Sequence, residues 1–269
     1  MSVPSTSSPS PRQVPRAPTG PAATLRGLWR LARALLHGLH GLVVVLLLFP
    51  RLAPAAREAR IRWWAGKMFR MLGMRLEVTG QFRPGAKLLV ANHVSWLDIL
   101  AVHAACPEAR FVSKAEVRHW PLVNRLVDSA RTLYLQRERA RDALRVVHEM
   151  AEALKAGDTV AVFPEGTTGN GHELLPFHAN LLQAAISTAT PVQPVALRFA
   201  DADGPVSTAA DFTGDITLVQ SLWALARARS MVVRLQVLTA VGTSHADRRA
   251  LAEHLRQLID DALQAQRAV

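Results

Sequence analysis

From residue 76 onward, short apolar blocks alternate with amphipathic stretches along the chain. The apolar blocks are rich in Val and Leu, which is typical of buried strands, and the stretches between them repeat apolar residues at helical spacing. Strands are expected at 87–91, 109–114, 132–137, 159–166, 192–199 and 231–241, and helices at 95–105, 138–157, 178–189 and 245–267. This alternation predicts an α/β fold with a mixed, largely buried sheet flanked by helices.

The first 75 residues follow a different pattern. Residues 34–50 form a run of 17 residues between two arginines that contains no acid, Lys or Arg. A membrane-spanning helix needs about 20 apolar residues, with a lower limit near 17. Two histidines and two glycines interrupt the run, so it indicates either a marginal span or one arm of a monotopic hairpin. The second arm would be 56–74, where apolar residues recur at helical spacing and arginines fill the other face; the alternative is an ordinary buried helix pair.

Charge supports a membrane contact for this segment. Residues 1–75 hold twelve Lys and Arg but one acid, Glu58, whereas the rest of the chain holds equal numbers of bases and acids. Basic residues around an apolar run favour an anionic membrane surface, whereas a nucleic-acid-binding protein would carry its basic face on the folded body. We therefore expect a disordered Pro- and Ser-rich tail at 1–22, membrane-anchoring helices at 23–75 and a folded domain at 76–269. The single cysteine, Cys106, lies in an apolar helix and indicates a core residue in a reducing compartment.

The stretch "LLVANHVSWLDIL" places polar residues where a buried strand ends. Asn92 and His93 follow the strand, and Asp98 lies in the first turn of the next helix. In that geometry the carboxylate can reach back to the imidazole, fix its tautomer and stabilise it when it takes a proton. The alternative is structural, because Ser95 and Asp98 match a capping box that would close the helix end.

Two further segments carry candidate binding residues. In "VFPEGTTGNG", Glu165, Gly166 and Thr167 follow a strand, and such a turn can cradle an oxyanion or phosphate, or be only a surface turn. Arg137 and Lys114 each end a strand and could bind a phosphate, or be solvated charges. The sequence has no GxSxG elbow, P-loop or GxGxxG motif, and its histidines lack partners at metal-ligand spacing, so no metal site is predicted.

Together these blocks resemble the glycerolipid acyltransferase superfamily, most closely the bacterial 1-acylglycerol-3-phosphate acyltransferases. The resemblance rests on "NHVSWLD", "FVSKAEVRHWPLVNRL", "TLYLQRER", "FPEGTT" and "VQPVAL", in the family's order. It implies acyl transfer from acyl-CoA or acyl carrier protein to the free hydroxyl of 1-acylglycerol-3-phosphate, giving phosphatidic acid, with no bound cofactor. His93 would be the general base and Asp98 its orienting partner. Asn92, Lys114, Arg137, Glu165, Gly166 and Thr167 would bind the substrate.

Two departures from the family pattern concern the acceptor. Gln136 stands where many members have an acid before the arginine, and Thr168 stands where many have Arg or Lys. A missing positive charge makes another lyso-lipid, such as lyso-ornithine lipid, an alternative acceptor. The rivals of other kinds are a non-catalytic membrane-associated lipid-binding protein and a hydrolase that uses Ser95 as its nucleophile. The expected location is the cytoplasmic face of a bacterial inner membrane.

Overall fold

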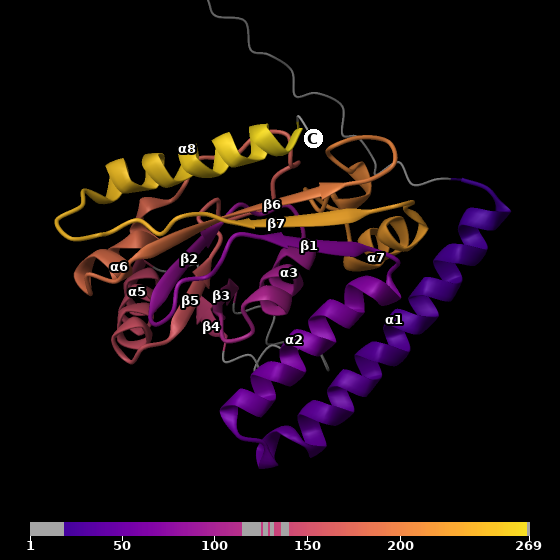
Figure 1. Ribbon diagram of the computed structural model, residues 1–269, viewed down its shortest axis with the longest axis horizontal. Coiled ribbons are helices and arrows are strands. Elements are labelled where there is room, and N and C mark those ends of the chain that lie inside the picture. The colour runs from indigo at the N-terminus through magenta and orange to yellow at the C-terminus, as the bar shows by residue number, and fades with distance from the viewer. Residues whose placement is uncertain (1–18, 115–124, 126–128, 130–131, 136–139, 268–269) are drawn as a thin grey trace, which may run out of the picture.

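The protein is built around a mixed sheet with helices on both faces (Figure 1). The computed structural model describes residues 19–114, 125, 129, 132–135 and 140–267. In this part of the chain the sheet has seven strands in the order β1-β7-β6-β2-β5-β3-β4, and only β6 and β7 are antiparallel neighbours. The strands are β1 (Arg75–Thr79), β2 (Lys87–Ala91), β3 (Arg110–Lys114), β4 (Leu133–Leu135), β5 (Thr159–Val162), β6 (Val192–Ala200) and β7 (Val232–Val237). The expected mixed α/β fold is confirmed.

The central strand β2 contributes to two separate cores. Its side chains alternate, so Leu88 and Val90 face one cluster of buried residues while Leu89 and Ala91 face the other. Helices α5 (Ala140–Lys155), α6 (Gln183–Ser187) and α8 (Arg248–Arg267) pack on the first face, and α2 (Pro54–Met71), α3 (Leu97–Ala105) and α7 (Leu218–Arg227) on the second. Because both faces are covered, the strand is buried throughout and only its end can present polar groups.

Three elements differ from the sequence prediction. The single helix expected at 178–189 is a 3₁₀ turn, η3 (Ala179–Leu182), followed by the short α6. Strand β1 and helix α7 were not expected. A capping box marks the start of α7, because the side chains of Thr217 and Gln220 each accept from the other's backbone N–H.

The N-terminal segment forms a helical hairpin. Helix α1 (Pro21–Leu47) turns through η1 (Phe49–Arg51) into α2. At the seam, His37 Nε2 lies 3.0 Å from the Trp64 carbonyl, and Trp64 Nε1 donates to the His37 carbonyl at 3.1 Å. A Cβ atom at Gly41 would lie 2.2 Å from Trp64 Nε1, so only glycine fits there. His37 and Gly41, which interrupt the apolar run, therefore lie at the contact between the two arms.

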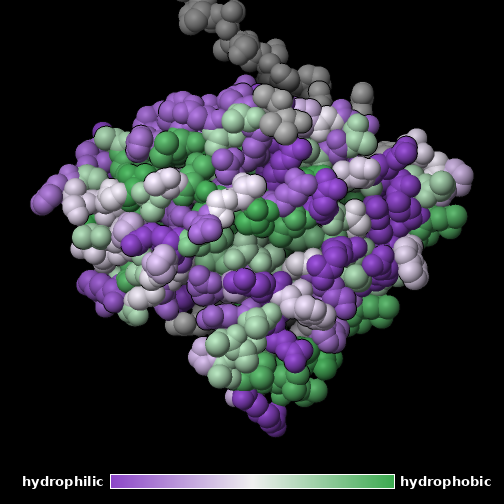
Figure 2. All heavy atoms as spheres, in the orientation of Figure 1, coloured by the Kyte–Doolittle hydropathy of each residue, from purple (hydrophilic) through white to green (hydrophobic). Residues whose placement is uncertain are grey.

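The opposite face of α1 exposes large apolar side chains (Figure 2). The exposed set is Leu25, Leu28, Trp29, Leu35, Leu36, Leu39, Val43, Leu46 and Leu47. In Figure 2 hydrophobic spheres gather on the right and lower margins of the molecule, where Figure 1 draws α1. Among the described helices, α1 has the length and composition needed to cross a membrane. Nine exposed large apolar side chains on one helix of a folded protein indicate an interaction surface.

Two arginines fasten α1 to the body of the protein. Arg30 Nη1 donates to the carbonyls of Ala226 at 3.2 Å and Ala228 at 2.6 Å, and Arg26 donates to the Arg227 carbonyl at 3.1 Å. These carbonyls end α7, so the cations complement the negative end of its dipole. On its other side the Arg30 guanidinium lies against Gly73, where an added Cβ would come within 2.2 Å of it. Arg30 thus joins α1, the end of α2 and the end of α7.

Candidate active site

The end of β2 is tied to the neighbouring strand β6 by Asn92. Its Nδ2 donates to the Leu197 carbonyl at 2.9 Å, and its Oδ1 accepts from the Leu197 N–H at 2.7 Å. The side chain is 2% exposed. These two bonds continue the strand pairing beyond the last ladder residue of β2, so the next residue, His93, leaves the sheet at a fixed position.

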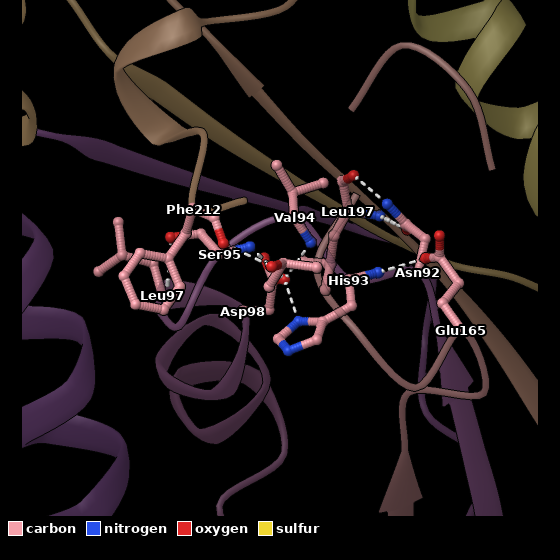
Figure 3. Close-up of polar contacts among 10 residues, drawn as sticks. Asn92, His93, Val94, Ser95, Leu97, Asp98, Glu165, Leu197 and Phe212 are labelled. Carbon is pink, nitrogen blue, oxygen red and sulfur yellow. Dashed lines mark hydrogen bonds and ion pairs between the residues drawn. The ribbon is translucent and has the colours of Figure 1, made fainter. Parts of the chain in front are cut away.

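His93 and Asp98 face each other across the turn between β2 and α3 (Figure 3). His93 Nδ1 lies 2.8 Å from Asp98 Oδ2, and the Asp98 side chain is fully buried. The same oxygen accepts the backbone N–H groups of Val94 at 2.7 Å and Ser95 at 2.9 Å. An oxygen that accepts from two backbone donors is an acceptor for the imidazole as well, so Nδ1 carries the ring proton. The basic nitrogen is then Nε2, which points away from Asp98 in Figure 3.

Asp98 therefore serves both of the roles considered for it from the sequence. It closes the start of α3 through the N–H of Ser95, as a capping-box acid would, and it holds His93 through the same oxygen. Ser95 is fully buried, and its Oγ accepts from the Leu97 N–H at 3.4 Å. A buried hydroxyl in that role cannot reach a substrate, which argues against a hydrolase that uses Ser95.

Glu165 fixes the backbone of His93 from the other side. Its Oε1 accepts the His93 N–H at 2.7 Å, and its Oε2 accepts the Leu175 N–H at 2.9 Å. Burial raises the pKa of Glu165 above its ordinary value, and the two backbone donors oppose that rise. The His93 carbonyl in turn accepts from the Gly169 N–H at 2.7 Å. The VFPEGTTGNG segment thus holds the histidine at both its N–H, through Glu165, and its carbonyl, through Gly169.

Gly166, Thr167 and Thr168 of this segment lie closer to the surface. Gly166 has φ +72°, a left-handed conformation that favours glycine, and it is half-buried. Thr167 is exposed. Thr168 Oγ1 donates to the Phe212 carbonyl at 2.5 Å, which joins the segment to the loop before α7. Gly166 and Thr167 can therefore meet a ligand, while the Thr168 hydroxyl is engaged within the protein.

Two other expected site residues are Lys114 and Arg137. Lys114 is the last residue of β3, at the same edge of the sheet as His93. Arg137 lies outside the described residues. A small pocket beside the motif is lined by Asn92, Glu165 and Gly169 and, on α8, by Asp260, Leu263 and Arg267.

Two other titratable groups near the site are buried. Burial lowers the pKa of His103, the histidine of α3, to about 4, so it is neutral at pH 7. Burial also raises the pKa of the Cys106 thiol, which is 1% exposed. Neither is placed to act on a ligand, and within the described ranges no group of three His, Cys, Asp or Glu side chains could hold a metal ion.

The His93 ring is partly open to solvent. Its side chain is 18% exposed, and one face of the ring lies on Phe163, with centroids 4.0 Å apart and an interplanar angle of 8°. Four further residues that build the site were not expected from the sequence: Phe163, Gly169, Leu175 and Leu197. An imidazole held at one nitrogen by a carboxylate, with the other nitrogen free, can take a proton from a bound hydroxyl.

Comparison with known proteins identifies relatives of this arrangement. A family model described as "Acyltransferase" matches residues 75–198, which contain all the motifs above. The chain is 38% identical to the lyso-ornithine lipid O-acyltransferase of Pseudomonas aeruginosa, over 77% of this chain and 79% of that protein. It is 34% identical to the 1-acyl-sn-glycerol-3-phosphate acyltransferase of Neisseria meningitidis, over 70% and 73%. The crystal structure of PlsC from Thermotoga maritima shares the fold, with a TM-score of 0.71 over 92% of this chain and 97% of that one at 23% identity.

Proposed function

Because the chain belongs to the acyltransferase family, we propose that it moves a fatty acyl group from a thioester to the free hydroxyl of 1-acylglycerol-3-phosphate, forming phosphatidic acid. The observation that carries this proposal is the 2.8 Å contact between His93 Nδ1 and the buried Asp98 carboxylate, with Nε2 directed away from Asp98. His93 and Asp98 are the catalytic residues of the proposal.

The reaction uses His93 as general base. Nε2 takes the proton of the acceptor hydroxyl while its oxygen attacks the thioester carbonyl, and the Asp98 carboxylate stabilises the imidazolium that forms. Collapse of the tetrahedral intermediate breaks the carbon–sulfur bond. The thiolate leaves and takes up the proton from the imidazolium, which restores neutral His93. A thiol with a pKa near 8.5 is a good leaving group, so no covalent acyl-enzyme is needed.

The residues expected to bind substrate divide into three groups. Asn92 and Glu165 are buried and spend their polar atoms on Leu197, His93 and Leu175, so they act by positioning His93. Gly166 and Thr167 are partly or fully exposed and would border the acceptor. Lys114 and Arg137 remain the proposed partners of an anionic headgroup.

The hairpin would place this site at a membrane. Its exposed leucines would enter the lipid, and the basic residues of α1 and α2 would meet anionic headgroups. A lyso-lipid acceptor could then reach His93 from the bilayer, while acyl-CoA or acyl carrier protein would deliver the acyl chain from the cytoplasm. We therefore propose the cytoplasmic face of the bacterial inner membrane as its location.

A second acceptor, lyso-ornithine lipid, is favoured by two observations. The lyso-ornithine lipid O-acyltransferases of Pseudomonas aeruginosa and Brucella abortus are 38% and 31% identical to this chain. Thr168 is uncharged, and its hydroxyl is bonded to the Phe212 carbonyl, so this position supplies no cation for a phosphate monoester. A zwitterionic headgroup would not need one.

The deciding experiment incubates the purified full-length protein in detergent with a labelled acyl-CoA or acyl carrier protein and with each lyso-lipid separately. Labelled phosphatidic acid as the main product supports the first acceptor, and labelled ornithine lipid supports the second. His93→Ala is the matched negative control. Binding of lipid without any acyl transfer would reject the enzyme and favour the non-catalytic alternative.

A further inference from the structure

Phe163 lies flat against the imidazole of His93 and takes part in no step derived above. It follows β5 directly and precedes the Pro164-Glu165 turn. The ring centroids are 4.0 Å apart and the planes differ by 8°, so the rings are stacked and not edge-to-face. Phe111 of β3 is in turn stacked on Phe163, with centroids 5.5 Å apart and an interplanar angle of 22°.

Among the described contacts of His93, the stacking on Phe163 is the one that acts on the ring plane. The bond between Nδ1 and Asp98 Oδ2 fixes one edge of the ring, but the ring can still turn by small angles about its Cβ–Cγ bond. The backbone bonds from Glu165 and Gly169 hold the main chain and not the ring plane. A flat surface at 4.0 Å opposes the turn, because rotation in either direction brings ring atoms into Phe163. Phe163 therefore restricts the direction of Nε2.

The arrangement also links the ring plane to the backbone anchor. Phe163 and Glu165 are two residues apart, and Glu165 accepts the His93 N–H at 2.7 Å. One turn after β5 therefore supplies both the surface under the ring and the acceptor for its backbone.

We propose that Phe163 is a positioning residue for the acyl transfer, which aims His93 Nε2 at the acceptor hydroxyl by holding the imidazole plane. This inference rests on the proposed function, since it assumes that His93 is the base. It predicts a loss in kcat rather than in acceptor affinity, because Phe163 acts through His93 and is not placed on the substrate. A misdirected base costs about 10–10²-fold, the size expected for small errors of alignment.

The test compares three variants of the full-length protein in detergent. Phe163→Leu removes the flat ring and keeps an apolar side chain, and kcat should fall about 10–10²-fold with KM nearly unchanged. Phe163→Tyr keeps the flat ring, so its kcat should lie within about threefold of the wild-type value. Phe111→Leu is the matched control, because it removes the next aromatic ring, which is 3% exposed and touches Phe163. It should leave kcat less affected than Phe163→Leu.

A spectroscopic measurement reads the stacking without activity. With histidine isotopically labelled, the ring protons of His93 should lie upfield because Phe163 covers one face, and they are assigned by their loss in His93→Gln. In Phe163→Leu they should move downfield, and in Phe163→Tyr they should stay. Equal loss of kcat in Phe111→Leu and Phe163→Leu, or unshifted His93 ring protons in the wild type, would overturn the inference. If His93→Ala stays active, it is the proposed function that fails, whatever the Phe163 variants do.

Discussion

The His93–Asp98 turn after β2 and the N-terminal hairpin are built in opposite ways. At the turn, polar side chains are buried and accept hydrogen bonds from backbone N–H groups, as do Asp98 Oδ2 and both carboxylate oxygens of Glu165. On the hairpin, α2 packs into the core, whereas α1 exposes apolar side chains and is bonded to the end of α7 by arginines, chiefly Arg30. The first region is organised to hold one imidazole still, and the second to offer a surface to something outside the protein. Changes at the turn should therefore affect chemistry, and changes on the hairpin should affect where the protein binds.

The largest expected effect is the loss of activity in His93→Ala. Removal of a general base reduces kcat by about 10²–10⁴-fold. The side chain is 18% exposed and bonded to Asp98, so the thermal unfolding midpoint should change little beside this loss. Single-turnover acyl transfer measures the first quantity and a melting curve the second. A His93→Ala protein with wild-type turnover would remove the distinction between the two regions.

Asp98→Asn should reduce activity by about 10²-fold and also weaken the fold. The amide keeps one oxygen but loses the charge that stabilises the imidazolium, and its NH₂ group cannot accept from a backbone N–H. Oδ2 serves Val94, Ser95 and His93 together, so we expect about 1–3 kcal/mol of lost stability. Urea unfolding measures the loss of stability, and turnover measures the loss of activity. Loss of activity alone would mean that the amide satisfies the same donors.

On the hairpin, the double variant Leu35→Glu and Leu36→Glu should reduce binding to anionic vesicles by more than about tenfold. The two side chains are 65% and 67% exposed, and burying each in lipid is worth roughly 1.5–3 kcal/mol. Vesicle flotation measures the binding, and turnover on substrate in detergent micelles should persist. Leu144→Glu is the control, because Leu144 is 72% exposed but lies on α5, away from the hairpin. Equal loss in the control would show that added negative charge, and not the hairpin surface, is responsible.

Arg30→Met should loosen the hairpin from α7 and lower stability by about 1–2 kcal/mol. The change removes a partly buried cation from the carbonyls of Ala226 and Ala228 but keeps the side-chain length. Arg60→Met, at an exposed position of α2, makes the same change of charge as a control. Limited proteolysis between α1 and α2 and thermal melting would compare the two. Indistinguishable variants would mean that Arg30 does not fasten the hairpin.

The smallest effect concerns pH. The pKa of Glu165 is raised in the folded state, so the folded protein holds this proton more tightly than the unfolded chain does. The stability contributed by this group therefore falls as pH rises from the unfolded pKa, about 4.3, through the folded pKa. Glu165→Ala loses that dependence, so the wild type's advantage over the variant should be greater at pH 4.5 than at pH 7. Urea unfolding at both pH values tests the sign, and a wild-type advantage that grows toward pH 7 would contradict it.

Local signals in the sequence were enough to predict the sheet's main strands and the pairing of His93 with Asp98. These two residues are five apart, and the strand-to-helix turn brings them together without help from elsewhere. Asn92 and Glu165 were named as substrate-binding residues, yet their partners are Leu197 and the His93 backbone, 105 and 72 residues away. Contacts at such separations depend on strand order, which a single sequence does not reveal.

Two omissions have different causes. Helix α7 was missed although Thr217 and Gln220 carried a capping-box signal at its start. Strand β1 was missed although its sequence, RLEVT, alternates polar and apolar residues. It is a five-residue edge strand with largely exposed residues, and no apolar block marks it. The interruptions at His37 and Gly41 weakened the case for a spanning helix for a sound reason, because both residues face α2.

The junction at Arg30 has a consequence for biosynthesis. Its acceptors on α7 lie 196 and 198 residues farther along the chain. At about 5–20 residues per second, a ribosome makes them roughly 10–40 seconds after α1 has emerged. For that interval the face of α1 that carries Ala23 and Gly27 has no α7 to pack against, while its leucines stay exposed even in the finished fold and need lipid or a chaperone throughout. Helix α1 is thus made well before the residues that fix it to the body.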